Sequence, residues 1–214
     1  IDNVVLTKKD HNLPNSAFIF GCFNSHQKIM PNIFEAWMRI LKKNNESVLW
    51  LINDNEISKK NLKIFADKKG INPERILFAD HLPFDQHLSR LKLVDLVLDT
   101  FPYNAHTTCS DALRVGIPVL TLKGKSFASR VATSLLTSMN LSELITDKLQ
   151  DYEEMAFKIS KDLDMFEKLK DKISENKIKS NVFKPDIYTK KIEESYKKVY
   201  QNYINGLEPK NFKL

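Results

Sequence analysis

Five short, almost entirely apolar runs alternate with stretches of helical periodicity along the first part of this chain, and this alternation restricts the fold more than any other feature. A strand that is apolar along its whole length must be covered on both faces, as in a parallel sheet between two layers of helices. The runs are Ala17–Phe23, Val48–Ile52, Ile76–Ala79, Leu93–Leu98 and Val119–Leu122. The alternation predicts an α/β fold with a Rossmann-like, doubly wound parallel sheet.

The helices are expected between these runs. One begins at Pro31, because proline suits the first turn of a helix, and its apolar residues have helical spacing. A second ends at Gly70, and three more begin near Pro83, Thr107 and Phe127.

The last third of the chain is different, since from about Gln150 its pattern is helical only, with one break at Asn181–Pro185. We expect the final helix to run from about Pro185 to Ile204. Its apolar stripe consists of Tyr188, Ile192, Tyr196, Val199 and Tyr203. Two explanations are open: the stripe packs against this domain, or it packs against a part of the protein outside this chain. We expect its tyrosines to be at least partly exposed or covered by a neighbouring chain.

Length and composition describe one globular domain. The 214 residues are 42% hydrophobic and 28% charged, and no apolar run approaches the ~20 residues that span a bilayer. The two cysteines, Cys22 and Cys109, are too few for a disulfide framework, and no signal segment is recognisable. We therefore expect a cytoplasmic protein with no membrane partner. The net charge of +6 comes from lysines interspersed with acidic residues, which is typical of solvated helix faces rather than of nucleic-acid binding.

Polar residues follow four of the five runs, and they include four of the five histidines. In an open parallel sheet ligands bind beyond the carboxyl ends of the strands, so these residues are expected at one edge. The segments are Asn24–Lys28, His81 with His87 and Arg90, Asp99–Thr108, and Lys123–Ser126. Four histidines at one edge indicate a binding site.

His106-Thr107-Thr108 is the most specific of these segments. It leads into an expected helix that contains Asp111. The free N–H groups and the positive end of a helix dipole form an anion site, and two hydroxyls add donors. A helix cap explains the threonines but not the histidine beside them. For Asp111 two readings are equal: an acceptor for a ribose diol, or an acid that is favourable in a first turn.

Lys28 follows the first run closely enough for its flexible ammonium to reach a bound phosphate, although most lysines in a lysine-rich chain are simply solvated. The chain has five glycines and neither the dinucleotide nor the P-loop pattern. This argues against a protein that binds NAD or FAD and against an ATP hydrolase. The absence of a His-x-x-x-His pair and the distance between the cysteines also argue against a metal site.

Several segments resemble the C-terminal catalytic domain of the protein O-linked N-acetylglucosamine transferases, in their bacterial and SPINDLY-like forms. These segments are Phe20–Ile29, Val48–Leu51, Leu98–Thr108, Gly116–Thr121 and Ala128–Ala132, and their order and spacing agree over residues 13–205. The resemblance implies the C-terminal half of the GT-B architecture, in which two Rossmann-like domains face each other. It also implies, as partners outside this chain, an N-terminal catalytic domain and tetratricopeptide repeats.

The resemblance assigns roles by position. Lys28 is the catalytic residue and holds the UDP diphosphate together with the three residues His106, Thr107 and Thr108. The other donor-binding residues are Asp111 at the ribose, His87 and Arg90 flanking the nucleoside, and Ser25. The implied reaction transfers N-acetylglucosamine from UDP-N-acetylglucosamine to Ser or Thr of a protein acceptor, with no cofactor and no required metal.

Two positions depart from the family pattern. Ser25 stands where the family usually has glutamine, and Phe84 where a lysine is often found near the ribose. These changes leave the diphosphate site intact but leave the exact sugar nucleotide open. The alternatives are a catalytically silent UDP-sugar sensor, a GDP-fucose-type protein fucosyltransferase and a UDP-sugar epimerase.

The expected organisation has three parts. Residues 1–12 are a linker from an upstream domain, residues 13–180 are the Rossmann-like UDP-sugar-binding domain, and residues 181–214 are a C-terminal helix and tail.

Overall fold

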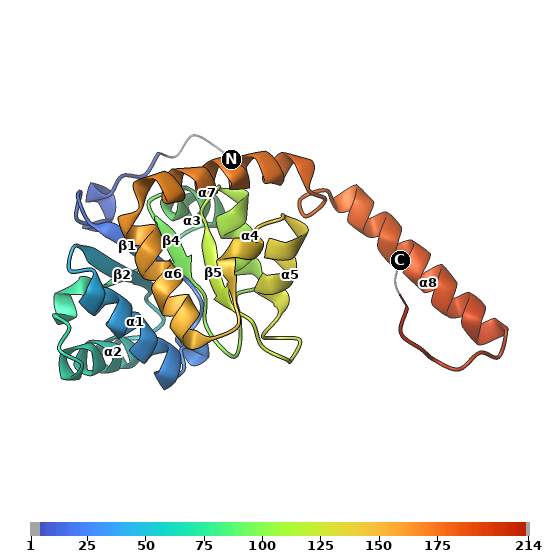
Figure 1. Cartoon of the computed structure of the whole chain (residues 1–214), viewed down its shortest axis with the longest axis horizontal. Helices are drawn as coiled ribbons and strands as arrows, with labels where there is room; N and C mark the ends of the chain where they lie inside the picture. Colours follow the sequence, from blue (N-terminus) through green and yellow to red (C-terminus); the bar gives the residue numbers. More distant parts are fainter. Residues whose placement is uncertain (1–4, 213–214) are drawn as a thin grey trace.

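The computed structural model describes residues 5–212, which contain one six-stranded sheet with every neighbouring pair of strands parallel (Figure 1). The strands are β1 (Phe18–Cys22), β2 (Ser47–Ile52), β3 (Ile76–Ala79), β4 (Leu96–Leu98), β5 (Val119–Leu122) and β6 (Ile145–Thr146). Their order in the sheet is β3-β2-β1-β4-β5-β6. The predicted α/β fold with a doubly wound parallel sheet is confirmed.

The direction of winding reverses between β1 and β4, which are direct neighbours in the sheet. At Gly21 in β1, an added Cβ would lie 2.7 Å from Cγ1 of Val94, so this close approach requires a residue without a side chain. The loops that follow the two strands diverge at such a reversal and leave a crevice beyond the carboxyl ends. The fold therefore places its ligand-binding crevice at the loops after β1 and β4.

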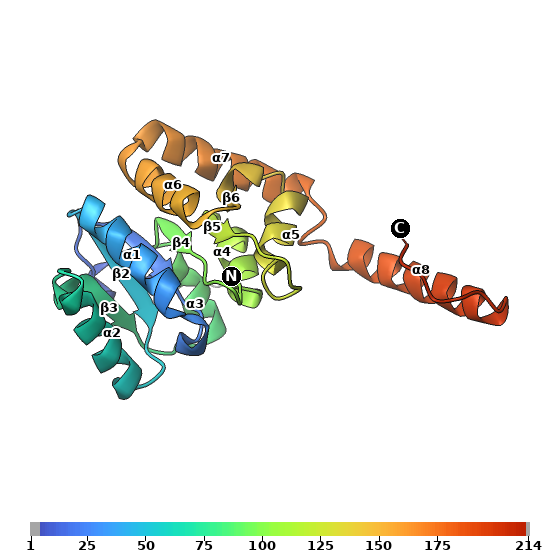
Figure 2. The ribbon, with the colours of Figure 1, turned by 60° about the horizontal axis from the view of Figure 1, so that its bottom comes forward.

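Helices cover both faces of the sheet (Figures 1 and 2). One face carries α1 (Pro31–Lys43), α2 (Glu56–Lys68) and α6 (Leu149–Lys161), and the other carries α3 (Phe84–Leu91), α4 (Thr107–Arg114) and α5 (Val131–Ser138). Helix α7 (Leu163–Lys179) lies across the amino ends of the strands, where Phe166 contacts Phe18 with 5.7 Å between ring centres. Four short 3₁₀ helices complete the body: η1 (Lys9–His11), η2 (His26–Lys28), η3 (Pro73–Arg75) and η4 (Ser142–Leu144).

The apolar runs are buried because both helix layers cover them. β2 is buried at all six of its positions. In the layer formed by α1 and α6, Nε1 of Trp37 donates to the hydroxyl of Tyr152 at 3.1 Å, and neither side chain is exposed. Because each large apolar side chain stabilises the fold by about 1.5–3 kcal/mol when buried, this core accounts for the apolar pattern of the runs.

Two strand predictions need correction. The fourth strand was expected from Leu93 but begins at Leu96, because the residues before it form the turn that ends α3, with Val94 N donating to Leu91 O at 3.0 Å. The sixth strand was not predicted. It has two residues, and so short a strand shows no periodicity.

One helix prediction also needs correction. The helix expected near Phe127 begins at Val131. In the intervening turn, the backbone N–H of Ser126 donates to the Ser129 hydroxyl at 3.1 Å, and that of Ser129 to the Ser126 hydroxyl at 3.3 Å. Such local side-chain bonds give the backbone an alternative to helix formation.

The predicted linker lies against the body over residues 5–12, while its residues 1–4 lie outside the described part of the chain. Leu6 N donates to Oγ of Ser89 at 3.4 Å, and Nζ of Lys8 donates to Ala17 O at 3.3 Å. A connection from these residues to an upstream domain remains a prediction.

Helix α8 (Pro185–Ile204) follows the predicted break and extends away from the body (Figures 1 and 2). Its bounds are those predicted from the sequence. Tyr188, Tyr196 and Tyr203 are 66%, 70% and 78% exposed. The prediction of an exposed tyrosine stripe is confirmed, and the explanation that the stripe packs against this domain is wrong.

Candidate functional site

The loop after β1 places Lys28 at the carboxyl edge of the sheet. Within η2 its side chain is half-buried, and Nζ donates to the carbonyl of Asn104 at 3.1 Å. The same ammonium lies 3.9 Å from the centre of the Tyr103 ring. Burial lowers the pKa of Lys28, and the negative charge of Asp99 raises it. Lys28 is thus a partly desolvated amine held against the loop that follows β4.

The loop after β4 is fixed by the buried carboxylate of Asp99. This carboxylate accepts hydrogen bonds from Ala105 N and from Oγ1 of Thr121, both at 2.6 Å. Burial raises the pKa of Asp99 to about 7, although these hydrogen bonds lower it. Because the loop is held at both ends, the Asn104 carbonyl that binds Lys28 is fixed in place before any ligand arrives.

Helix α4 points its N-terminus at the same edge. His106 is the N-cap residue, and its side chain makes no capping bond, so the N–H groups of the first turn lack an intrahelical partner. The Thr108 hydroxyl donates to Oδ1 of Asn24, and Nδ2 of Asn24 donates to Oγ1 of Thr100 at 2.8 Å. Asn24 therefore joins the end of β1 to the start of α4, and this helix end attracts anions.

Helix α3 supplies His87 and Arg90. Nε of Arg90 donates to Nδ1 of His87 at 3.1 Å. Burial lowers the pKa of His87 to about 4, which agrees with an Nδ1 that accepts. His87 lines a small cavity together with Asn24 and Thr108, so the structure brings it to the loop after β1 and the start of α4.

Arg90 is enclosed by protein groups. Its side chain is only 1% exposed, and its guanidinium also donates to the carbonyl of Asp80 and stacks 4.9 Å from the Phe23 ring centre. The guanidinium is thus occupied by protein groups, one of which is His87, and a place for Arg90 beside a nucleoside stays a prediction.

The remaining predicted residues are less closely tied to Lys28. Asp111 is 7% exposed one turn into α4, where burial raises its pKa, and both readings of it stay open. Oγ of Ser25 donates to Oδ2 of Asp54 at 3.0 Å. Thr107 is exposed at the first position of α4, and Phe84, at the start of α3, is 60% exposed.

Sequence reasoning named the segments of the site but missed the residues that connect them. Asn24 and Thr108 are 84 positions apart, and neither Tyr103 nor Asn104 was assigned a function. In the sequence, the one indication that Tyr103 and Asn104 belong to the site was their position in the segment that follows the fourth predicted strand.

Several buried polar atoms at this edge have no hydrogen-bond partner within residues 5–212. They include both ring nitrogens of His26, Nε2 of His106 and Oδ1 of Asn104. Buried polar groups nearly always have a partner, so these four atoms have unused hydrogen-bonding capacity for the polar groups of a ligand.

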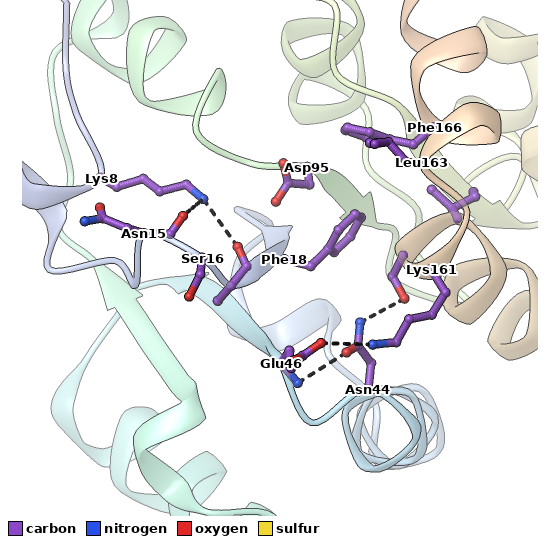
Figure 3. Close-up of a pocket in the computed structure, with 13 residues that line it drawn as sticks. Lys8, Asn15, Ser16, Phe18, Asn44, Glu46, Asp95, Lys161, Leu163 and Phe166 are labelled. Carbon is purple, nitrogen blue, oxygen red and sulfur yellow. Dashed lines mark hydrogen bonds and ion pairs between the residues drawn. The ribbon is translucent and has the colours of Figure 1, made fainter.

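A second cavity, of about 320 Å³, lies at the opposite edge of the sheet (Figure 3). Phe18, Phe166 and Asp95 line it, together with Lys8, whose ammonium donates to the carbonyls of Asn15 and Ala17. Its volume alone does not make it the site, because it faces the amino ends of the strands, where α4 and the other helices that follow strands do not begin.

Among residues 5–212, no group of three or more His, Cys, Asp or Glu side chains is placed to hold a metal ion. No helix in the same part of the chain is both long enough and apolar enough to cross a membrane.

An all-parallel sheet with this strand order, a lysine after β1 and an anion-attracting helix start after β4 define the Rossmann-like class of domain found in GT-B glycosyltransferases. The chain belongs to glycosyl transferase family 41, whose sequence profile matches residues 1–192.

Two curated relatives are similar over almost the whole chain. The probable UDP-N-acetylglucosamine–peptide N-acetylglucosaminyltransferase SEC of Arabidopsis thaliana is 32% identical over 97% of this chain and 21% of its own length. The corresponding Caenorhabditis elegans transferase is 30% identical over 96% of this chain and 18% of its own length. The chain therefore spans about a fifth of these relatives.

Two solved structures are similar to this chain. A mutant O-GlcNAc transferase of Thermobaculum terrenum has a TM-score of 0.83 and 27% identity over 88% of this chain and 37% of its own. The UDP-GlcNAc 2-epimerase of Neisseria meningitidis has a TM-score of 0.56 at 11% identity, over 76% of this chain and 41% of its own. The second similarity shows the fold alone.

Proposed function

We propose that this chain is the donor-binding half of a glycosyltransferase that moves N-acetylglucosamine from UDP-N-acetylglucosamine to Ser or Thr of proteins. The observation that carries the proposal is the meeting of Lys28 and the start of α4 at one crevice, where Asn24 bonds to Thr108 and Asn104 to Lys28. The family, and the activity for which its members are named, supply the donor and the acceptor of this proposal.

The diphosphate is assigned to Lys28, His106, Thr107 and Thr108. A UDP leaving group departs with increasing negative charge on its terminal phosphate. A fixed ammonium and the N–H groups of a helix start stabilise that charge most strongly in the transition state. These groups supply the stabilisation without a metal ion, so we propose a transfer that requires no metal and no cofactor.

The nucleoside is assigned to the neighbouring groups. His87 lies beside Asn24 and Thr108, oriented by Arg90, and Asp111 and Ser25 complete the donor site. Because the His87 imidazole is neutral above pH about 4, it offers hydrogen bonds without adding charge.

The acceptor side of the reaction is assigned to parts of the protein outside this chain. We propose that an N-terminal catalytic domain faces the crevice, that tetratricopeptide repeats bind the acceptor protein, and that the enzyme acts in the cytoplasm. In this arrangement residues 13–180 bind the donor, residues 1–12 connect to the upstream domain and residues 181–214 form the terminal helix.

The experiment is a panel of UDP- and GDP-sugars tested against the full-length protein, with transfer to protein followed by mass spectrometry. Transfer from UDP-N-acetylglucosamine alone supports the proposal, and transfer from GDP-fucose contradicts the donor. Conversion of the free sugar nucleotide points to the epimerase, and binding without turnover to the silent sensor. The isolated chain should bind UDP, seen as a raised melting temperature, and should not transfer sugar because the acceptor side is missing.

A further inference from the structure

Asp99 is the most deeply placed charged group beside the crevice. It follows β4 directly, is 0% exposed, and receives hydrogen bonds from the backbone N–H of Ala105 and Thr100 and from the hydroxyl of Thr121. The Tyr152 hydroxyl donates to its backbone carbonyl at 3.1 Å. Every polar atom of this residue is therefore held in place.

The loop that Asp99 holds contacts the Lys28 ammonium. The bond to Ala105 closes the loop of residues 99–105, and that loop presents the Asn104 carbonyl and the Tyr103 ring to the ammonium. Since Ala105 also precedes the N-cap residue of α4, the same bond fixes where the helix begins. Asp99 thus lies behind both elements that face the diphosphate.

The charge of Asp99 acts on a defined set of neighbours. Burial raises the pKa of three of them, Cys22 of β1, Cys109 of α4 and Tyr152 of α6, and the charge of Asp99 raises these pKa values further. All three side chains therefore stay neutral near pH 7. Lys28 is the charged side chain that lowers the pKa of Asp99. No ion pair joins Asp99 and Lys28 within residues 5–212, but each charge favours the ionised form of the other.

The hydrogen bonds alone do not require a carboxylate. Asparagine has the same shape: its Oδ1 could accept from Ala105 N, and its Nδ2 could donate to Oγ1 of Thr121, since a hydroxyl both donates and accepts. Burying an ionised carboxyl is unfavourable. An anion at this position therefore costs stability that a neutral amide would not cost.

We propose that Asp99 is a positioning residue whose buried negative charge keeps the Lys28 ammonium protonated and whose hydrogen bonds fix the loop that orients it. The proposal deepens the function proposed above, because the ammonium it maintains is the one assigned to the diphosphate. Without this anion, the desolvation of Lys28 would lose the larger of the two effects that oppose it, and the amine would lose its proton at lower pH.

The test compares Asp99→Asn with Asp95→Asn in the full-length protein. Asp95 lies at the other end of β4 and is a matched control: burial raises its pKa too, and Oδ2 accepts from the backbone N–H of Ile19 at 2.7 Å. Competitive acetylation of lysines across a pH series, read by mass spectrometry, gives the titration midpoint of Lys28 whether or not the protein turns over.

Asp99→Asn should lower the Lys28 midpoint by about 1 pH unit, because a nearby opposite charge favours the ionised form, and Asp95→Asn should leave it unchanged. The basic limb of kcat/KM should move by the same amount, because this ratio reports the free enzyme. At pH 8 the melting temperature of Asp99→Asn should equal or exceed that of the unmodified protein.

Three results would overturn the proposal: an unchanged Lys28 midpoint in Asp99→Asn, an equal shift in Asp95→Asn, or failure of Asp99→Asn to fold, since the last would make the bonds rather than the charge essential. Failure of the proposed function is a separate result. An unmodified protein without turnover contradicts the transferase, while acetylation still reports the pairing of Asp99 with Lys28.

Discussion

The amino and carboxyl edges of the sheet contain similar side chains but differ in their ability to bind an anion. Each has a lysine whose ammonium donates to backbone carbonyls, Lys8 at the amino edge and Lys28 at the carboxyl edge. Each also has an aspartate beside β4: half-buried Asp95 lies before the strand, and buried Asp99 lies after it. The amino edge even has an open cavity of about 320 Å³ (Figure 3).

The difference lies in the backbone. In a parallel sheet every helix that follows a strand begins at the carboxyl edge, so the N–H groups of α4 point there, and the positive ends of helix dipoles attract anions. At the amino edge α7 lies across the strand ends, with Phe166 against Phe18. Side-chain composition and cavity size therefore do not locate the site, whereas chain direction does.

Removing the two lysines gives the largest expected difference between the edges. Lys28→Ala should lower kcat by about 10²–10³-fold with a smaller change in donor KM, because the charge it stabilises grows in the transition state. Lys28→Arg should restore little, since a planar guanidinium does not occupy the same point. Lys8→Ala should leave kcat within about twofold, consistent with the ~0.5 kcal/mol typical of surface substitutions.

Steady-state kinetics of the full-length variants, with circular dichroism as a check on folding, would measure this difference. Equal losses for Lys8→Ala and Lys28→Ala would show that the comparison of edges is wrong. A normal kcat in Lys28→Ala would leave the start of α4 as the charge stabiliser.

The two threonines at the start of α4 should separate stability from binding. Thr108→Val leaves buried Oδ1 of Asn24 without its donor, so it should cost about 1–3 kcal/mol of unfolding free energy and also weaken UDP binding. Thr107→Val changes an exposed hydroxyl and should weaken UDP binding while stability stays within about 0.5 kcal/mol. Urea unfolding and calorimetry with UDP measure the two quantities, and identical stability of both variants would refute the role given to Asn24.

Acid should destabilise the carboxyl edge through His87. Burial lowers its pKa from 6.5 to about 4, so between these values the unfolded chain binds a proton that the folded chain does not. Its contribution is fully present above pH 6.5 and is lost as pH falls toward 4, by about 1–2 kcal/mol after allowance for partial exposure. His87→Gln should flatten this slope when unfolding is followed from pH 4 to 7. His81→Gln removes only the smallest of the three causes of the lowered His87 pKa, after burial and Arg90, and should change the slope much less.

A tyrosine outside both edges should have the smallest effect. Tyr196 on α8 is 70% exposed, so Tyr196→Ser should change the unfolding free energy of this chain by less than about 0.5 kcal/mol. By contrast, Tyr152→Phe in the core removes a buried hydroxyl that accepts from Trp37 and donates to the Asp99 carbonyl. This change should lower the unfolding free energy by about 1–3 kcal/mol. A large loss of stability in Tyr196→Ser would mean that α8 packs on the body in solution.

The fold was predictable to the extent that its signals are local. Four of the six strands were located by their apolar runs to within one or two residues at each end, and α8 was placed with its observed bounds. The start of α5 was misplaced because the hydrogen bonds between Ser126 and Ser129 compete with helix formation over a few residues. Among the site residues, Lys28 and the start of α4 were recognisable because each directly follows a strand.

The sequence by itself determined five of the six strands, the helices between them and the loops that meet at the carboxyl edge, because apolar periodicity and the alternation of strands with helices can be read along the chain. Only the tertiary structure decided that Arg90 is enclosed, that Asn24 bonds to Thr108, that Thr121 donates to Asp99, and that the stripe of α8 stays exposed. The physical reason is that these contacts join residues far apart in the chain. Strand register and helix packing set them, and no local pattern encodes either one.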